Sequence, residues 1–347
     1  MRKSFLVTLI TAVSFSVIAQ NKSDKEPYMT KSLSNESVKN TEVQTSGGSI
    51  SVTGVNSVAE TKVEVYVSSN MGREDNLSKE EIEKRLQEYD LNVSVSNNKL
   101  TAIAKPKQRN MDWKRGLSIS FKVFVLKNVS TDLTTSGGSI SIANLNGDQK
   151  FTTSGGSLHV DNVGGKVNGA TSGGSIQLEN SRDDIELTTS GGSIDARNSE
   201  GKLRLSTSGG SLNLKDLKGD IKATTSGGSV SGRNIGGELI AHTSGGGIHL
   251  TELSCSIEAS NSGGGIDIEI KELGKYVKIS NSGGGIDLQL PKNKGVDLDI
   301  TGDRVKTDQL GKFDGKVEDD RIEGKLNGGG VPVRVRSSSG RISLVFK

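Results

Sequence analysis

The chain has 347 residues, of which 31% are apolar and 3% aromatic, and its 44 basic and 41 acidic side chains give a formal net charge of +3. So few apolar residues cannot fill a large three-dimensional core, and the bases and acids are interspersed along the chain. A nucleic-acid-binding protein would show a basic stripe with stacking aromatic residues, so we expect no nucleic-acid partner.

The first 19 residues have the pattern of a secretory signal peptide. Arg2 and Lys3 supply a positively charged start, and the apolar stretch that follows is too short to span a bilayer comfortably. Cleavage is expected before Gln20, and the alternative is an uncleaved membrane anchor. No other stretch is expected to cross a membrane. We therefore expect an exported protein, located in the periplasm, on the outer surface or outside the cell.

Residues 20–40 are rich in Asn, Ser, Lys and Glu, a composition that predicts a disordered spacer. The domain that follows, residues 41–347, opens with one repeat-like segment over residues 41–55. An irregular insertion over residues 56–130 then breaks the repeat. We expect this insertion to act as an N-terminal cap, because the first edge of a stacked sheet otherwise invites aggregation.

The insertion is predicted to combine strands with one helix. Ser78 begins a capping box, which predicts a helix to about Tyr89. Ile82, Leu86 and Tyr89 would then lie on one face of that helix and could pack on the rest of the domain. Alternation of apolar and polar residues predicts strands over residues 61–67, 91–95, 100–104 and 117–126, with a hairpin turn at Asn97-Asn98.

The dominant feature of the sequence is a Thr-Ser-Gly-Gly-Ser-Ile motif that recurs at a fixed interval from Thr135. An outlying copy starts at Thr45, and a degenerate one lies near Ser337. The leading Thr or Asn occurs at Thr135, Thr153, Thr171, Thr189, Thr207, Thr225, Thr243, Asn261 and Asn281, so the first seven steps are 18 residues long and the last is 20. Each unit is too small to bury its own apolar face, so this repetition indicates units stacked on one another.

Each unit predicts two short strands and two turns marked by glycine, since glycines cost about 1 kcal/mol each inside a helix. Stacking the units produces apolar columns, among them Ile140, Leu158, Ile176, Ile194, Leu212, Val230, Ile248, Ile266 and Ile286, and a thinner one of Phe151, Gly169, Leu187, Leu205, Ala223, Ala241 and Ala259. The motif threonines share the inward parity and could form a threonine ladder. A polar column of Asp148, Lys166, Asp184, Lys202, Asp220 and Glu238 mostly alternates in sign, so neighbours ~4.8 Å apart attract each other.

These columns predict an all-β fold, a parallel β-solenoid with one turn per repeat. The regular repeats cover residues 131–290. Residues 291–347 loosen the pattern and are expected to form C-terminal rungs and a cap. Lone Cys255 occupies a position where other repeats have a turn glycine or aspartate, and no intramolecular disulfide is possible. A buried thiol is favoured over a reactive or intermolecular one.

The serial TSGGSI units, the block NSGGGIDLQLP at residues 281–291 and the closing pattern GKLNGGGVPVRVRSSSGRISL at residues 324–344 carry a family resemblance. From about Thr41 to the C-terminus, the chain resembles a bacterial family of exported "putative adhesins" with glycine-rich β-strand repeats. That family is a domain of unknown function related to the head domain of autotransporter adhesins. The resemblance implies a β-helix outside the cytoplasm, and it implies no catalytic residues.

Two kinds of metal site can be tested on the sequence. The histidines are His159, His242 and His249, and the first and last share a column but lie five rungs apart, about 24 Å at the ladder spacing. Calcium-binding β-rolls place aspartates within their turns, whereas these turns are Ser-Gly-Gly-Ser. Asp267, Asp287 and Glu269 form a small acidic cluster that is better explained as a solvated face. We expect no metal and no cofactor.

Polysaccharide-active enzymes are the main competing class, because many β-helices are lyases or hydrolases. Such enzymes need paired carboxylates, or a calcium ion with a base, in a cleft. Asp195, Glu179 and Arg197 are the candidate grouping, and charge pairing between neighbouring rungs explains them equally well, as it does for Glu186 and Arg204. The sequence contains no nucleophile elbow and no phosphate-binding loop.

The sequence therefore predicts an exported, non-enzymatic β-solenoid that acts as an adhesin or cell-envelope interaction scaffold. It would bind through flat, repetitive faces, with no catalytic, metal or cofactor residue assigned and the binding residues left open. The partner is also open, with a surface glycan or a protein as the candidates. The alternatives are a polysaccharide-active enzyme and a structural envelope protein without a specific ligand.

Overall fold

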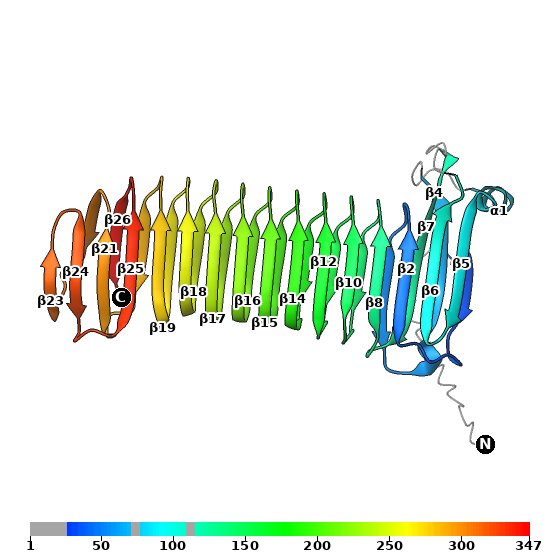
Figure 1. Ribbon diagram of the computed structural model, residues 1–347, viewed down its shortest axis with the longest axis horizontal. Helices are drawn as coiled ribbons and strands as arrows, with labels where there is room; N and C mark the ends of the chain where they lie inside the picture. Colours follow the sequence, from blue (N-terminus) through cyan, green and yellow to red (C-terminus); the bar gives the residue numbers. More distant parts are fainter. Residues whose placement is uncertain (1–25, 71–76, 109–114) are drawn as a thin grey trace, which may run out of the picture.

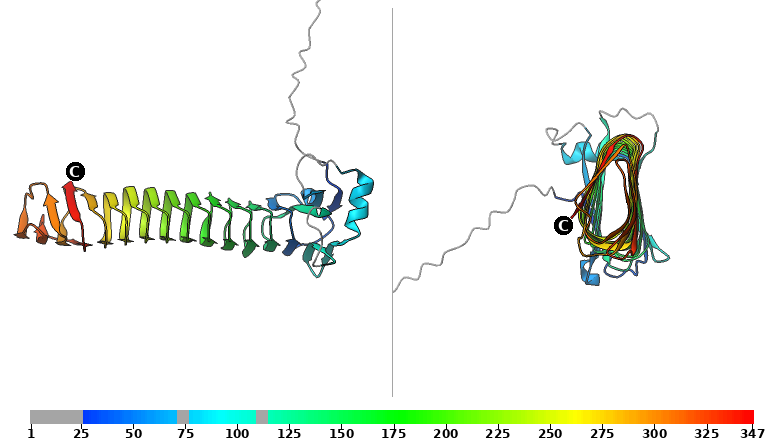
Figure 2. Two further views of the ribbon diagram at one scale, coloured as in Figure 1. Left: turned by 90° about the horizontal axis from the view of Figure 1, so that it is seen from above. Right: turned by 90° about the vertical axis from the view of Figure 1, so that its left-hand side faces the viewer.

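The computed structural model describes residues 26–70, 77–108 and 115–347. Figure 1 shows a long, flat rod of stacked strands with a cap at its N-terminal end, and the end-on view of Figure 2 shows a flattened ring with two long sides. The fold is nearly all-β, as predicted. The predicted signal peptide and its cleavage site lie outside the described residues, as do residues 20–25 of the predicted spacer.

The elements before the regular repeats make up the cap and the first rungs. They are β1 Met29–Ser32, β2 Asn40–Thr45, β3 Ile50–Val55, the short helix η1 Val58–Glu60, β4 Lys62–Ser69, helix α1 Lys79–Leu86, β5 Tyr89–Ser96, β6 Lys99–Pro106 and β7 Leu117–Leu126.

The regular stack and the C-terminal region follow. The regular strands are β8 Ser130–Thr135, β9 Ile140–Ala143, β10 Gln149–Thr153, β11 Leu158–Asp161, β12 Lys166–Thr171, β13 Ile176–Glu179, β14 Arg182–Thr189, β15 Ile194–Thr207, β16 Leu212–Thr225, β17 Val230–Thr243, β18 Ile248–Asn261, β19 Ile266–Asn281 and β20 Ile286–Leu290. The last strands are β21 Val296–Thr301, β22 Arg304–Thr307, β23 Phe313–Val317, β24 Arg321–Leu326, β25 Val331–Ser337 and β26 Arg341–Phe346.

Each rung has two long sides, which we call wall 1 and wall 2. Wall 1 holds the residues that follow each Ser-Gly-Gly turn, and wall 2 holds the residues that precede the next turn. From β15 to β19 one continuous strand runs through wall 1, a short third side and wall 2. Ile194 lies between Ile176 and Leu212 in parallel register, so the 18-residue period is confirmed. The core consists of the columns of apolar side chains that fill the narrow space between the walls.

The predicted columns are confirmed in register and burial. In the first apolar column every residue from Ile140 to Ile286 is at most 2% exposed. The thin column also stands as predicted: Gly169 lies between Phe151 and Leu187, and their side chains fill the space that a side chain at Gly169 would take. The walls are therefore close together, and a modest number of apolar residues is enough to fill the interior.

The motif threonines line up in one buried column, but their hydroxyls bond to glycine backbone and not to one another. Thr207 Oγ1 donates to the carbonyl of Gly192 in the preceding rung at 2.8 Å and accepts from the amide of Gly210 at 3.2 Å. A ladder of hydroxyls bonded to one another would leave these buried backbone groups unpaired, which costs free energy. At Asn261 the side-chain amide replaces the threonine hydroxyl and donates to the carbonyl of Gly246 at 2.8 Å.

The corner between wall 1 and the short third side is built from residues with positive φ, a feature that the sequence analysis missed. The corner residues are Asn144, Asn162, Asn180, Asn198, Asp216, Asn234 and Glu252, with φ between 50° and 58°. Asparagine tolerates this left-handed conformation better than most residues. It also bonds along the stack, as where Asn162 Nδ2 donates to Asn144 Oδ1 at 2.7 Å. The recurrence of Asn every 18 residues was the available signal.

The insertion forms the N-terminal cap, and its strands are confirmed. Thr45 pairs directly with Thr135 in the adjacent rung. The segment between these threonines has the length of five repeats, but it does not form five rungs between them. β6 and β7 add one rung outside β2 and β3, and β5 and β4 then pair antiparallel on the outside. The predicted hairpin turn is confirmed, since Asn97 and Asn98 both have positive φ.

Two details of the N-terminal prediction are wrong. Met29–Ser32 forms strand β1, which pairs antiparallel with β4, and Leu33 is 1% exposed. The predicted spacer therefore contains an ordered segment. The helix begins at the predicted cap, where Ser78 accepts from the Glu81 amide, but it ends at Leu86. Tyr89 starts strand β5 instead, which pairs with β6, and its hydroxyl accepts from the buried amide of Leu117 at 2.7 Å.

The C-terminal region forms rungs and a cap in an unexpected order. In sequence, β20 is followed by β21 and β22. These two strands do not stack directly on β19 and β20, so the position of one rung between them is left unfilled at this point of the chain. The hairpin of β23 and β24 pairs onto the outside of β21. The last two strands then fill the open rung, with β25 between β19 and β21, and β26 between β20 and β22. Ser337 pairs with Asn281, so the degenerate motif copy is confirmed in its register.

Candidate functional site

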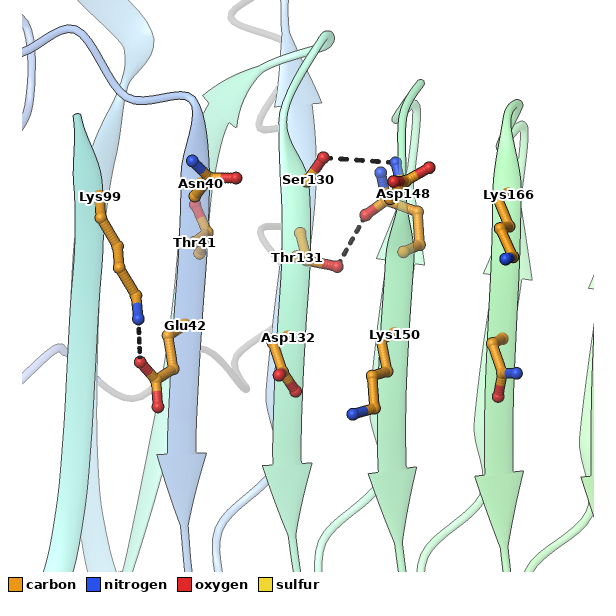
Figure 3. A pocket seen from close by; sticks show the side chains of 12 residues that line it. Asn40, Thr41, Glu42, Lys99, Ser130, Thr131, Asp132, Asp148, Lys150 and Lys166 are labelled. Carbon is orange, nitrogen blue, oxygen red and sulfur yellow. Dashed lines mark hydrogen bonds and ion pairs between the residues drawn. The ribbon is translucent and has the colours of Figure 1, made fainter.

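The described surface offers shallow hollows along the walls. One, with a volume of about 650 Å³, lies on wall 2 near the cap, across β6, β2, β8, β10 and β12. Figure 3 shows its side chains in rows along those strands. Lys99 Nζ lies 2.6 Å from Glu42 Oε2, and Thr131 Oγ1 donates to Gln149 Oε1 at 2.7 Å. The contacts that Figure 3 marks run between neighbouring rungs. They are explained by their contribution to the stability of the stacked rungs.

Two further hollows adjoin each other on wall 1 and overlap along the solenoid axis. One measures about 460 Å³ and extends from Asp195 to Thr251, and the other measures about 450 Å³ and extends from Ser229 to Asp287. Both are lined by Ser231 and His249, and they lie on opposite sides of this column of side chains. The first extends over Arg197, Lys215 and Arg233, and the second extends over Ser229, Gly247 and Gly265, so together they form one shallow, two-sided depression along the solenoid axis. We call it the wall 1 trough.

The candidate catalytic grouping is held in pairs between rungs. Arg197 Nε lies 3.4 Å from Glu179 Oε1, and Asn213 Nδ2 donates to Asp195 Oδ1 at 2.6 Å. Each carboxylate therefore has a structural partner on a neighbouring strand. The structure brings the three residues onto the same wall, as predicted, and charge pairing accounts for them.

One predicted pair has a different partner. Glu186 and Arg204 lie opposite each other in register, but Arg204 Nη1 bonds to Asp184 Oδ1 at 2.9 Å. Asp184 belongs to the column that was predicted to alternate in sign with Lys166 and Lys202. The diagonal partner is preferred because the long arginine side chain reaches along the wall to the carboxylate two residues away. Such exposed pairs contribute well under about 1 kcal/mol each.

The three histidines lie apart, and each has a neighbour one rung away. His159 Nδ1 lies 2.7 Å from Gln177 Oε1, and His242 Nδ1 lies 2.7 Å from Ser260 Oγ. His249 Nδ1 lies 2.9 Å from Asp267 Oδ2 on the exposed face of wall 1. The predicted separation of His159 and His249 follows from the confirmed rung order.

The acidic cluster spreads over two rungs. Asp267 pairs in register with Asp287, and Glu269 accepts from Gln289 Nε2 at 3.1 Å. Over residues 26–70, 77–108 and 115–347, no three His, Cys, Asp or Glu side chains come together in a way that could hold a metal ion. Within the same ranges, no helix has the length and apolar character needed to cross a bilayer.

Cys255 is buried, as predicted, with 1% of its surface exposed. It lies in register with Gly237 of the preceding rung, on the short third side, and with Leu273 of the following rung. The strand register is irregular here, which accommodates the side chain where other rungs have glycine. Burial raises the pKa of the thiol to about 12. The residue is therefore held as a neutral thiol inside the wall.

We expect Cys255 to make the fold sensitive to alkaline pH. The thiol ionises near pH 9 in the unfolded chain and near pH 12 in the folded one, so the unfolded state binds fewer protons between these values. Stability should fall by about 1.4 kcal/mol per pH unit in that window. The measurement is the free energy of unfolding from pH 8 to pH 11, compared with Cys255→Ala. Burial also raises the pKa of Tyr276 to about 12, but Tyr276 is common to both proteins and contributes equally to both curves. Parallel pH curves for the two proteins would therefore contradict the assignment.

Comparison with known proteins gives a family match over part of the chain and no activity. Residues 202–345 match the family model described as Toastrack DUF4097, a domain of unknown function with a β-solenoid-like fold. Among solved structures, the chain is similar to one titled a "putative cell adhesion protein" from Clostridium sporogenes, at 10% identity and a TM-score of 0.20, covering 92% of this chain and 98% of that one. No curated protein matches the chain significantly.

Proposed function

We propose that this chain is an exported, non-enzymatic interaction scaffold of the cell envelope, of the adhesin type, that binds its partner through its side walls. The observation that carries the proposal is the regularity of those walls. Outward side chains repeat at the ladder spacing over many rungs, and several are held by a neighbour one rung away, as with Asn213 and Asp195. Such a surface suits a partner that is itself repetitive.

The regularity also supports the choice of a scaffold over an enzyme. Many weak contacts along a rigid stack add up to useful affinity, because every contact after the first is intramolecular. Side chains already fixed by their neighbours lose little conformational entropy on binding. The carboxylates considered for catalysis serve instead as partners of Arg197 and Asn213.

The proposal is tested by presenting the chain without residues 1–19 to arrays of glycans and of envelope proteins. We expect binding without any change in the ligand. Cleavage of a glycan, lost in Asp195→Asn, would replace the scaffold by an enzyme. Absence of binding on both arrays would favour a structural protein without a ligand. Cell fractionation of the full chain, with and without residues 1–19, tests export in parallel.

A further inference from the structure

The wall 1 trough carries one outward polar side chain on each rung it crosses. These side chains are Asp195, Asn213, Ser231, His249, Asp267 and Asp287, and they are consecutive register partners. Six rungs at the ladder spacing span roughly 24 Å between the first and the last. The trough therefore offers a hydrogen-bonding group at every ~4.8 Å along the axis, which suits a linear ligand that repeats its own hydrogen-bonding groups.

The floor of the trough has glycines that the fold does not require. Gly247, Gly265 and Gly285 replace the serine that ends the motif in earlier rungs, and none of them has a positive φ. A Cβ at Gly265 would meet only the carbonyl of Gly285, at an ordinary contact distance of 3.7 Å. At Gly247 and Gly285 a Cβ would lie 3.3 Å from Gly265 O and 3.4 Å from Arg341 O, a tight fit that requires a small shift of the neighbouring backbone. Backbone conformation therefore permits a side chain at all three positions, and packing permits one most readily at Gly265.

These glycines also give up a stabilising contact. In preceding rungs the serine hydroxyl accepts a hydrogen bond from the next rung, as where Ser211 Oγ accepts from the Ser229 amide at 3.2 Å and Ser229 Oγ accepts from the Gly247 amide at 3.3 Å. Residues that lower stability without a compensating contact point to a function. Here they flatten the floor over the rungs where the trough is open.

The charges along the trough are mixed. Arg197, Lys215 and Arg233 occupy consecutive rungs beside it, and the nearby carboxylates are Glu179, Asp195, Asp216, Glu252 and Asp267. The Arg233–Glu252 contact of 2.6 Å lowers the pKa of the Glu252 carboxyl through its hydrogen bond. A polyanion would meet these carboxylates and a polycation would meet the three bases. A chain of neutral hydroxyl groups, which donate and accept, can pair with both.

We propose that the wall 1 trough binds a neutral linear polysaccharide, laid along the solenoid axis with successive sugars on successive rungs. Asn213 and His249 would contact sugar hydroxyls, Ser231 and the floor glycines would let the chain approach, and the bases and carboxylates at the sides would complete the hydrogen bonds. This inference rests on the proposed function, and it specifies the wall and the ligand class.

The test uses an array of linear hexasaccharides in which neutral, uronate-containing and sulfated chains form separate arms. The blocking variant is Ser231→Arg, at a column position that accepts side chains as large as Gln177 and His249 elsewhere. Its matched control is Ser206→Arg, the same substitution on wall 2. We expect wild type and Ser206→Arg to bind neutral chains, and Ser231→Arg to bind at least about tenfold more weakly.

Two further variants keep the test decisive if Ser231→Arg fails to fold. Asn213→Ala with His249→Ala should weaken binding by a similar factor without filling the trough. The triple variant Gly247→Ser, Gly265→Ser and Gly285→Ser should weaken binding, while the midpoint of denaturant unfolding stays the same or rises. A merely structural role of these glycines would not produce this combination.

The outcomes separate the two proposals. If wild type binds and the binding is weakened by Ser206→Arg but not by Ser231→Arg, the trough is not the binding site. The proposed scaffold function would still stand. Binding confined to the uronate or sulfated arm would overturn the neutral ligand. If wild type binds nothing on this array but binds an envelope protein, the polysaccharide is wrong and the scaffold stands. If it binds neither, both are wrong.

Discussion

Deletion of residues 189–206 is expected to leave a folded, shorter solenoid, whereas deletion of residues 198–206 is expected to unfold the stack. The first removes one complete turn, so Thr207 takes the place of Thr189 and every later residue keeps its wall. The second removes the short third side and the wall 2 strand of one rung. The next wall 1 strand would then have to occupy wall 2, with its side chains matched to the wrong columns.

The structure selects this unit among the equivalent ones. Without residues 189–206, Leu178 would face Leu214 and Glu179 would face Lys215, an apolar pair and a pair of opposite charges. Removal of residues 207–224 would instead leave Ala196 facing Gly232, with an unfilled space between them. Stability in repeat proteins is close to a sum over units, so the 18-residue deletion should cost roughly 1–3 kcal/mol.

The measurements are circular dichroism and denaturant unfolding of both variants and the wild type. The shorter deletion should lose the cooperative transition, although it removes half as many residues. Equal tolerance of the two deletions would show that the walls are interchangeable and would contradict the register. Loss of folding in both would show that the units are not independent.

How far the sequence predicts this fold depends on whether a feature repeats. The apolar columns, with Ile176, Ile194 and Leu212 in adjacent rungs, follow from the period alone, because every 18th residue sees the same environment. The asparagine corner repeats just as regularly. The positive φ of Asn198 could have been predicted from the recurrence of Asn at this interval together with the tolerance of Asn for positive φ. The cap helix was predicted at Ser78 because its capping box is local.

Features that occur once were harder to predict. The pairing of Thr45 with Thr135 skips the whole insertion, and the position of β25 between β19 and β21 reverses chain order. Both depend on contacts between distant segments, which no local pattern encodes. The wall 1 trough was missed for a related reason. Its residues were considered separately, Asp195 in charge pairing and His249 as a candidate metal ligand, and only the surface shape shows that Ser231 and His249 line two adjoining hollows.

The two glycines of a single turn are expected to differ sharply in their tolerance of a methyl group. At Gly210 a Cβ would lie 2.1 Å from the carbonyl oxygen of Gly192 and 2.4 Å from its carbon, both backbone atoms of the preceding rung. At Gly209 the nearest atoms, the carbonyl oxygens of Gly191 and Ser190, are 3.5 Å away, an ordinary contact. Neither glycine has a positive φ, so the difference lies in the approach of the rungs alone.

Gly210→Ala should therefore cost about 3 kcal/mol or more, because the two rungs must separate and the Thr207 hydroxyl loses its contact with the Gly192 carbonyl. Gly209→Ala should change stability by about 0.5 kcal/mol or less, and it can stabilise slightly by restricting the unfolded chain. The measurement is the free energy of denaturant unfolding of the two variants against wild type. A similar loss of stability in both variants would mean that backbone conformation requires both glycines. Similar stability of both variants would mean that the rungs are not in the close contact that holds the threonine column in place.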